Sequence, residues 1–289
     1  MDINDWKTAG RVAGEALEFG KSLVKKDASV LDVANKIEDF IRSKGCIPAF
    51  PVNISFNEVA AHSTAKHNDD TKFSDQLVKL DVGVCFNGAI GDTAATIDLS
   101  GKYSELVAAS QEALDNALKI LKPGITLGEI GAEIEKTIFA KGFKPVVNLS
   151  GHGLGEYEVH KSPSIPNHDN QDNRTIEKGD VFAIEPFAST GAGMIYESGE
   201  PLIFMLENPR PVRDMTSRQL LNEIVKFKGL PFASRWLPNT PRIAFAIREL
   251  AKTGILHTFP PLVDKAKGMV SQAEHSVYMD EEPIVLTRL

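Results

Sequence analysis

The sequence contains only two cysteines in 289 residues, Cys46 and Cys85, and it has no C-x-x-C motif. This scarcity argues against a disulfide framework, a dithiol redox centre and a thiolate zinc site. No run of about 18 apolar residues is present, and the N-terminal segment lacks the hydrophobic core of a secretory signal. We therefore expect a cytoplasmic protein that does not span a membrane.

Basic residues are also in the minority, because 32 Lys and Arg stand against 39 Asp and Glu, a formal net charge of −7. A protein whose main ligand is nucleic-acid phosphate usually carries a basic excess, so we do not expect nucleic acid as the main ligand. Hydrophobic residues make up 42% and charged residues 25%, as in ordinary globular chains. The length predicts two domains or one large one.

Apolar residues recur at helical spacing in four segments of the first half of the chain. The last of them opens with Thr126 and Glu129, the pattern of a capping box. The predicted helices cover residues 5–24, 30–41, 104–121 and 126–141.

Strands are predicted where β-branched and aromatic residues lie between turn signals. Residues 77–86 and 89–99 flank Asn87-Gly88, the strongest two-residue hairpin signal. Residues 181–188 read as one further strand, and residues 269–279 and 283–287 as a closing hairpin.

The composition changes between residues 208 and 264, which are rich in proline and show helical patterns at 216–228 and 242–252 but no clear strand alternation. We interpret this stretch as a helical insertion subdomain at 208–264 on an α+β body formed by residues 1–207 and 265–289. A weak internal repeat, in which His62 precedes Asp81 much as His160 precedes Asp180, hints at two related half-domains.

The hairpin makes a geometric prediction about two carboxylates. If Asn87 and Gly88 form the turn, Gly83 faces Asp92, and Asp81 lies on the same face of the sheet. Their Cα atoms are then roughly 7–8 Å apart, as diagonal cross-strand neighbours. Two such carboxylates repel each other unless a cation lies between them, and a pair of metal ions about 3.5–4 Å apart would fit. The alternative is that both simply face solvent.

Three further residues have the chemistry of metal ligands. His152 lies among glycines, where the backbone can approach closely, and Glu185 and Glu274 lie in apolar strand-like runs. Each signal is weak alone, because a strand glutamate more often pairs with an arginine or faces water. Together with the two aspartates they form an oxygen-rich set that suits Mn²⁺, Fe²⁺, Co²⁺ or Zn²⁺.

In their order along the chain, these residues resemble the ligand set of the methionine aminopeptidases. The flanking motifs match as well: Ala61-His62-Ser63, Lys79-Leu80-Asp81-Val82-Gly83, Gly151-His152-Gly153, Ile184-Glu185-Pro186 and Glu274-His275-Ser276. The resemblance implies the α+β pita-bread (creatinase/aminopeptidase) fold, with two pseudo-symmetric halves and the metals between them. The interval of 89 residues from Glu185 to Glu274 is similar to the compact, archaeal-style type II enzymes, which carry a helical insertion there.

The resemblance also implies a function, namely removal of the N-terminal methionine from nascent proteins with a preference for a small second residue. Water activated by two divalent ions (Co, Mn, Fe or Zn) would attack the peptide bond. The partners would be nascent polypeptide N-termini, and transient association with the ribosome is compatible with this role. We expect a monomer.

By the same resemblance, Asp81 holds one metal ion, His152 and Glu185 hold the other, and Asp92 and Glu274 bridge both. His62 and His160 would donate hydrogen bonds to the scissile amide or the oxyanion, and Phe50 would line the methionine pocket. Without the resemblance, His62 is as well explained as a surface histidine and His160 as a loop histidine. We assign no role to the other four histidines, His67, His168, His257 and His275.

Two other functions within the same fold stay open at this point. Proline-specific (Xaa-Pro) peptidases use a similar ligand set but usually carry a substantial domain ahead of the catalytic body, whereas only about 55 residues precede Ser55-Phe56 here. A non-enzymatic pita-bread binding protein would have lost metal ligands and would carry basic tails. An unrelated metal-dependent hydrolase would match the order of these motifs only by coincidence.

Overall fold

The computed structural model describes residues 1–289 and is built around a nine-stranded antiparallel sheet. Its strand order is β1-β4-β5-β19-β11-β8-β9, with β2 paired to β4 and β20 paired to β19. The bounds are β1 Ile47–Pro48, β2 Asn53–Phe56, β4 Leu77–Phe86, β5 Ala89–Asp98, β8 Ser150–Gly155, β9 Glu158–Pro166, β11 Val181–Ile184, β19 Glu274–Tyr278 and β20 Ile284–Val285.

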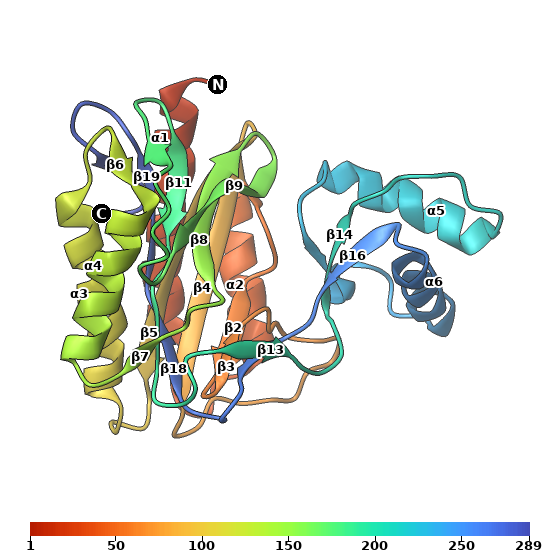
Figure 1. The fold of residues 1–289 in the computed structure, drawn as a ribbon. Helices are drawn as coiled ribbons and strands as arrows, with labels where there is room; N and C mark the ends of the chain where they lie inside the picture. Colours follow the sequence, from red (N-terminus) through yellow and green to blue (C-terminus); the bar gives the residue numbers. More distant parts are fainter.

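Two helix pairs pack against this sheet, and each pair buries an apolar core of its own (Figure 1). The helices are α1 Ile3–Leu23, α2 Val30–Ser43, α3 Ser104–Ile120 and α4 Leu127–Ala140. Thr126 and Glu129 form the predicted capping box at the start of α4. All four predicted helices are confirmed to within a few residues. None of the helices is long and apolar enough to cross a membrane.

The β4–β5 hairpin has the predicted register. Asn87 and Gly88 have positive φ angles of 52° and 97°, which a two-residue hairpin turn requires. Gly83 pairs with Asp92, and Asp81 pairs with Ala94. The prediction that both aspartates lie on one face of the hairpin is therefore confirmed.

Two predicted strands are each divided in two. Residues 181–188 form β11 and then β12 (Phe187–Ser189), and residues 269–279 form β18 (Val270–Gln272) and then β19. The prediction of continuous strands is wrong. Pro186 has no N–H to donate to a ladder and ends the pairing of 181–188 in the large sheet, and the chain likewise changes sheet at Ala273, between β18 and β19. Strands β12 and β18 pair with each other in a separate sheet together with β7 (Lys144–Pro145).

The second half of the chain also forms a lobe beside the body (Figure 1). It contains α5 (Met215–Ile224), α6 (Pro241–Lys252) and the short strands β14 (Ile203–Leu206), β15 (Phe232–Ala233) and β16 (Leu256–Phe259). Both helices fall where the sequence predicts them, although α5 ends earlier than expected. The three-stranded sheet was not expected, since no strand alternation is visible in this segment.

Short elements join the lobe to the body. Strands β13 (Ile195–Glu197), β17 (Leu262–Asp264) and β3 (Val59–Ala61) form a three-stranded sheet, and β17 follows β16 of the lobe along the chain. Within the body, β6 (Ile125–Thr126) pairs with β10 (Thr175–Ile176) at the start of α4. The sheet of the lobe runs from residue 203 to residue 259. The division at residues 208 and 264 stays a prediction.

Close packing of α1 against β5 depends on a glycine. A Cβ atom at Gly91 would lie 2.5 Å from the carbonyl oxygen of Ala9 and 2.6 Å from Cα of Gly10. Because these are backbone atoms, the helix itself would have to move.

We predict that Gly91→Ala lowers the free energy of unfolding by about 1–3 kcal/mol, measured by urea denaturation. The exposed Lys7→Ala on the same helix is the control, and equal midpoints for the two variants would contradict the packing argument.

Candidate metal centre

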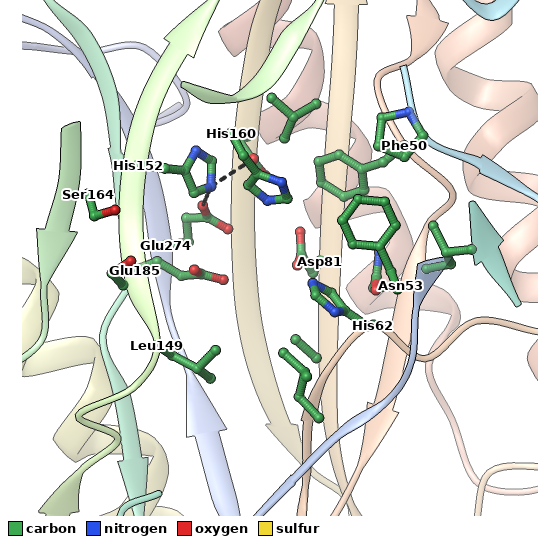
Figure 2. Close-up of a pocket in the computed structure, with 18 of the residues that line it drawn as sticks. Phe50, Asn53, His62, Asp81, Leu149, His152, His160, Ser164, Glu185 and Glu274 are labelled. Atoms are coloured by element: carbon green, nitrogen blue, oxygen red, sulfur yellow. Dashed lines mark ion pairs between the residues drawn. The ribbon is translucent and has the colours of Figure 1, made fainter. Parts of the chain in front are cut away.

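A cavity of about 520 Å³ opens between the sheet of the body and the lobe. All eight residues singled out from the sequence line this one cavity: Phe50, His62, Asp81, Asp92, His152, His160, Glu185 and Glu274. In Figure 2, His152, Glu185 and Glu274 project from one wall and face Asp81 and His62 on the opposite wall. The tertiary structure thus brings together side chains that are far apart in the sequence.

The strand registers place the carboxylates in adjacent rows. Ala94 pairs with Asp81 on one side and with Glu274 on the other, so these three residues form one row across β4, β5 and β19. His152 pairs with Ala183 of β11. The ligand atoms fall into two groups, each within 4.8 Å: Asp92, His152 and Glu274, and Asp81, Glu185 and Glu274. Glu274 is common to both groups.

His152 is oriented as a neutral ligand. Its Nδ1 lies 3.3 Å from the carbonyl oxygen of Gly153, while its Nε2 lies 3.8 Å from Asp92 and 4.0 Å from Glu274 (Figure 2). Burial, with a smaller effect of His160, lowers the pKa of His152 to about 3. The flanking glycines allow this placement, since a Cβ at Gly153 would lie 2.7 Å from the carbonyl oxygen of Ser162.

The carboxyl groups are buried without a cationic partner. Asp81, Asp92 and Glu274 are 8%, 2% and 1% exposed, and none forms an ion pair with lysine or arginine. Burial raises the pKa of Asp81 to about 7. Burial first, and then the neighbouring carboxylates, raise the pKa values of Asp92, Glu185 and Glu274 well above the usual range.

The unpartnered oxygens fit divalent cations. Oδ1 of Asp81, Oδ1 of Asp92 and both carboxylate oxygens of Glu274 are buried without a hydrogen-bond donor. Buried carboxylates normally require a donor, an opposite charge or a metal ion. Four carboxylates and one imidazole supply oxygen-rich ligation of the kind that Mn²⁺, Fe²⁺, Co²⁺ and Zn²⁺ accept.

Gln272 belongs to this centre and was missed in the sequence. Its side-chain amide donates to Oδ2 of Asp81 at 3.2 Å and to Oε1 of Glu185 at 2.7 Å. It thereby orients two carboxylates from different parts of the chain, Asp81 on β4 and Glu185 in the link between β11 and β12. The available signal was its position two residues before Glu274, the spacing of residues that share one face of a strand.

Aromatic rings line one side of the cavity. The His160 ring meets the His152 ring edge to face at 4.7 Å, and the His62 ring meets Phe259 at 5.3 Å. Burial, followed by the nearby His160, lowers the pKa of His62 to about 4. Desolvation by its neighbours, followed by the nearby His257, lowers the pKa of His160, although the residue is exposed to solvent. Phe50 lies against Gly83, where a side chain would collide with the ring.

Other residues of the cavity were not expected. Phe259 and His257 both line it, and their rings meet at 4.6 Å, although no role is expected for this histidine from the sequence. Asn53 is buried opposite Asp81. His275, to which no role is assigned from the sequence, does not line the cavity, and its Nδ1 lies 2.8 Å from Oγ1 of Thr287.

A buried carboxylate-rich centre at the end of an open cavity is typical of metal-dependent hydrolases. The sequence profile of metallopeptidase family M24 matches residues 4–220. The chain belongs to metallopeptidase family M24. It is 43% identical to the methionine aminopeptidase of Archaeoglobus fulgidus over 96% of both chains, and 40% identical to that of Pyrococcus abyssi over 99% of both.

Solved structures with lower identity show the fold. The methionine aminopeptidase of Thermotoga maritima matches with a TM-score of 0.74 and 22% identity, over 99% of this chain and 96% of that one. A thermophilic Arx1 matches with a TM-score of 0.87 and 16% identity, over 98% and 90%. The prolidase of Pyrococcus furiosus reaches a TM-score of 0.65 and 19% identity, over 99% and 64%. The chain has the expected α+β pita-bread fold.

The raised carboxyl pKa values predict how metal-free stability depends on pH. The folded-state pKa of Asp92 lies above its unfolded value, so its contribution to stability is present at low pH and is lost as the pH rises toward the folded pKa. Asp92→Asn removes this titration and keeps the shape. We predict that the metal-free variant gains thermal stability over the wild type, by an amount that grows to several degrees between about pH 4 and pH 8.

The comparison with the wild type cancels the groups that the two proteins share, including the buried histidines. Thermal unfolding followed by circular dichroism in the presence of a chelator measures the difference. Asp70→Asn, at an exposed loop position, should change the melting temperature little at any pH. A stability gap that shrinks as the pH rises would contradict burial of an unbalanced carboxylate.

Gln272 provides a second prediction at this centre. Gln272→Met keeps the approximate size but removes the donor that holds Asp81 and Glu185, so metal binding should weaken about 10- to 100-fold. Isothermal titration with Mn²⁺ measures the effect, with Gln111→Met on the exposed face of α3 as the matched control. An unchanged dissociation constant would show that Gln272 does not organise the centre.

Proposed function

We propose that this metallopeptidase removes the N-terminal methionine from nascent proteins. The observation that carries the proposal is the meeting of all five expected ligands in one cavity, in a chain 40–43% identical to named methionine aminopeptidases over nearly its whole length. Divalent metal use follows from membership of the family. The number and identity of the ions belong to the proposal.

In the proposed centre, Asp81, Asp92, His152, Glu185 and Glu274 hold two divalent ions, which are Co, Mn, Fe or Zn. Bound ions would supply Lewis acidity, which polarises a carbonyl and makes water more acidic. The bridging role of Glu274 is supported by its place in both ligand groups. Glu185 lies nearer to Asp81 in the structure, whereas the resemblance pairs it with His152, so the division of ligands between the ions stays a prediction.

The histidines are suited to hydrogen bonding at neutral pH. Because burial lowers the pKa values of His62 and His160, both rings are neutral there and each carries one N–H donor. We propose that His160 donates to the developing oxyanion and His62 to the scissile amide. Gln272 donates to Oε1 of Glu185, which orients this carboxylate and leaves Oε2 for ligation of a divalent ion.

The shape of the cavity supports methionine as the first residue. Phe50, Ile203, Pro231 and Phe259 are among its apolar lining residues, and a thioether makes favourable contacts with aromatic rings. The ligand carboxylates lie at the end of the same cavity, where they can hold the free α-amine of a substrate. An internal peptide segment has no such amine. The preference for a small second residue stays a prediction.

The subtype and the cellular setting complete the proposal. The lobe between Glu185 and Glu274 and the archaeal relatives support assignment to the compact, archaeal-style type II enzymes. Cytoplasmic location, the monomeric state and transient contact with the ribosome stay predictions. An Xaa-Pro peptidase is less favoured because its support is the shared fold at 19% identity, and a non-enzymatic role is disfavoured by the intact ligand set.

Peptide cleavage tests the proposal. The metal-free protein supplemented with Co²⁺ or Mn²⁺ should release free methionine from peptides that begin Met-Gly and leave matched Xaa-Pro peptides intact. Asp92→Ala should abolish the release while far-ultraviolet circular dichroism stays that of the folded protein. Selective cleavage before proline, or full activity in Asp92→Ala, would overturn the proposal.

A further inference from the structure

A buried ion pair joins the lobe to the body behind the wall of the cavity. Glu38 of α2 and Arg235 of the short helix η2 (Ser234–Trp236) have side chains only 2% and 3% exposed. Nη2 of Arg235 donates to Oε1 of Glu38, and Nε1 of Trp236 donates to Oε2 at 2.8 Å. Buried ion pairs often add little net stability, so this one is better explained by what it holds in place.

The second arm of the guanidinium reaches the chain segment that follows His62. Nη1 of Arg235 donates to Oγ1 of Thr64 at 2.9 Å, and the same hydroxyl donates to the carbonyl oxygen of Val52 at 2.7 Å. Nε2 of His67 also lies 3.1 Å from the carbonyl oxygen of Ser234. Residues 64–67 are therefore fastened to the lobe.

His62 lies in a conformation that needs such support. Its φ angle is +62°, in the left-handed region that a non-glycine residue rarely adopts unless its surroundings impose it. On one side, Ala61 pairs with Leu262 of β17. On the other side, Thr64 is held by Arg235. This backbone conformation directs the His62 side chain toward Phe259, and the two rings meet edge to face with their centroids 5.3 Å apart.

We infer that Arg235, held by Glu38, is a positioning residue for His62. Arg235 does not line the cavity, so it acts on the reaction only through the backbone that aims the histidine. The inference rests on the proposed function for its kinetic consequence but not for its structural one. A guanidinium suits this task because its planar fork can hold a carboxylate and a hydroxyl at the same time in a fixed geometry.

The structural consequence is tested without substrate. In the wild type, the ring current of Phe259 shifts the ring protons of His62, which NMR of histidine-labelled protein resolves and His62→Ala assigns. Arg235→Met should move these signals toward the values of a free histidine. Arg248→Met, on an exposed position of α6, should leave them unchanged. Unmoved His62 signals in folded Arg235→Met would overturn the inference.

The kinetic consequence is tested by a double-mutant cycle on methionine release from a Met-Gly peptide. Arg235→Met should lower kcat/KM by up to about 100-fold, the cost of a misplacement of about 1 Å in an active site. In the His62→Ala background the same change should cost less than about threefold, because the two residues act as a unit. If the two substitutions lower kcat/KM by independent factors that multiply in the double variant, Arg235 does not act through His62.

Loss of stability is separated from loss of position by three further variants. Leu250→Ala destabilises the core of the lobe and should spare kcat, whereas Thr64→Val keeps the side-chain shape and should lower kcat about tenfold. If Arg235→Met does not fold, Thr64→Val replaces it in the double-mutant cycle with His62→Ala. Arg235→Lys should restore only part of the activity, and full restoration would contradict a role for the fork.

The proposed function and the inference fail in different ways. If the wild type releases no methionine, the proposed function is lost, while the NMR comparison still decides the inference. If the wild type is active but Arg235→Met leaves both the His62 signals and kcat/KM unchanged, the inference alone is overturned. The Mn²⁺ dissociation constant should stay within about threefold in every Arg235 variant, because Arg235 contacts no carboxylate of the centre.

Discussion

Four carboxyl groups, three of them buried and that of Glu185 half-buried, meet around one point without lysine or arginine to balance them, and this is the constraint on which the structure depends. Charged carboxylates in a protein interior are unfavourable unless a cation or a set of donors compensates them. Here the unpartnered oxygens of Asp81, Asp92 and Glu274 meet in one cavity. The two cores between helices and sheet stabilise the fold, and this stability offsets the unfavourable burial of carboxylates in a centre suited to divalent ions.

The antiparallel sheet makes this arrangement rigid. Asp81, Ala94 and Glu274 lie in one hydrogen-bonded row, so their positions follow from the strand register and not from the freedom of loops. The breaks after Ile184 and at Ala273 then let the chain pass into a second small sheet just where Glu185 and Glu274 must turn toward the cavity. Gln272, at the end of one broken strand, holds the carboxylates of Asp81 and Glu185 together.

The lobe supplies what the sheet does not, namely the far wall of the cavity. Ile203, Pro231 and Phe259 reach the cavity from the lobe, while Phe50 and His62 reach it from the body. A pocket shared between two packed units requires their relative position to be fixed. The pair of Glu38 and Arg235 joins the two units, and through Thr64 the same hydrogen-bonded network reaches the segment that follows His62.

Local patterns were sufficient for much of the molecule. The turn at Asn87-Gly88 fixed the register that places Asp81 and Asp92 on one face, and the capping box at Thr126 marked the start of α4, because both depend on residues that are neighbours in sequence. The same patterns misread 181–188 and 269–279 as continuous strands, since a change of sheet at Pro186 is decided by which partner strand is available. The place of His257 in the cavity lining and the strands of the lobe could not be seen in the sequence either, because both depend on packing.

Each metal-ligand candidate gives only a weak signal in the sequence. Their order and flanking motifs together resemble a known ligand set, and this resemblance made it possible to name all five. Their meeting in space, the donor role of Gln272 and the contact of Glu38 with a residue 197 positions away depend on the tertiary structure. The physical reason is that side-chain type and local spacing determine which chemistry a residue can perform. The distance and burial that give that chemistry its strength arise only when remote strands and the lobe pack together.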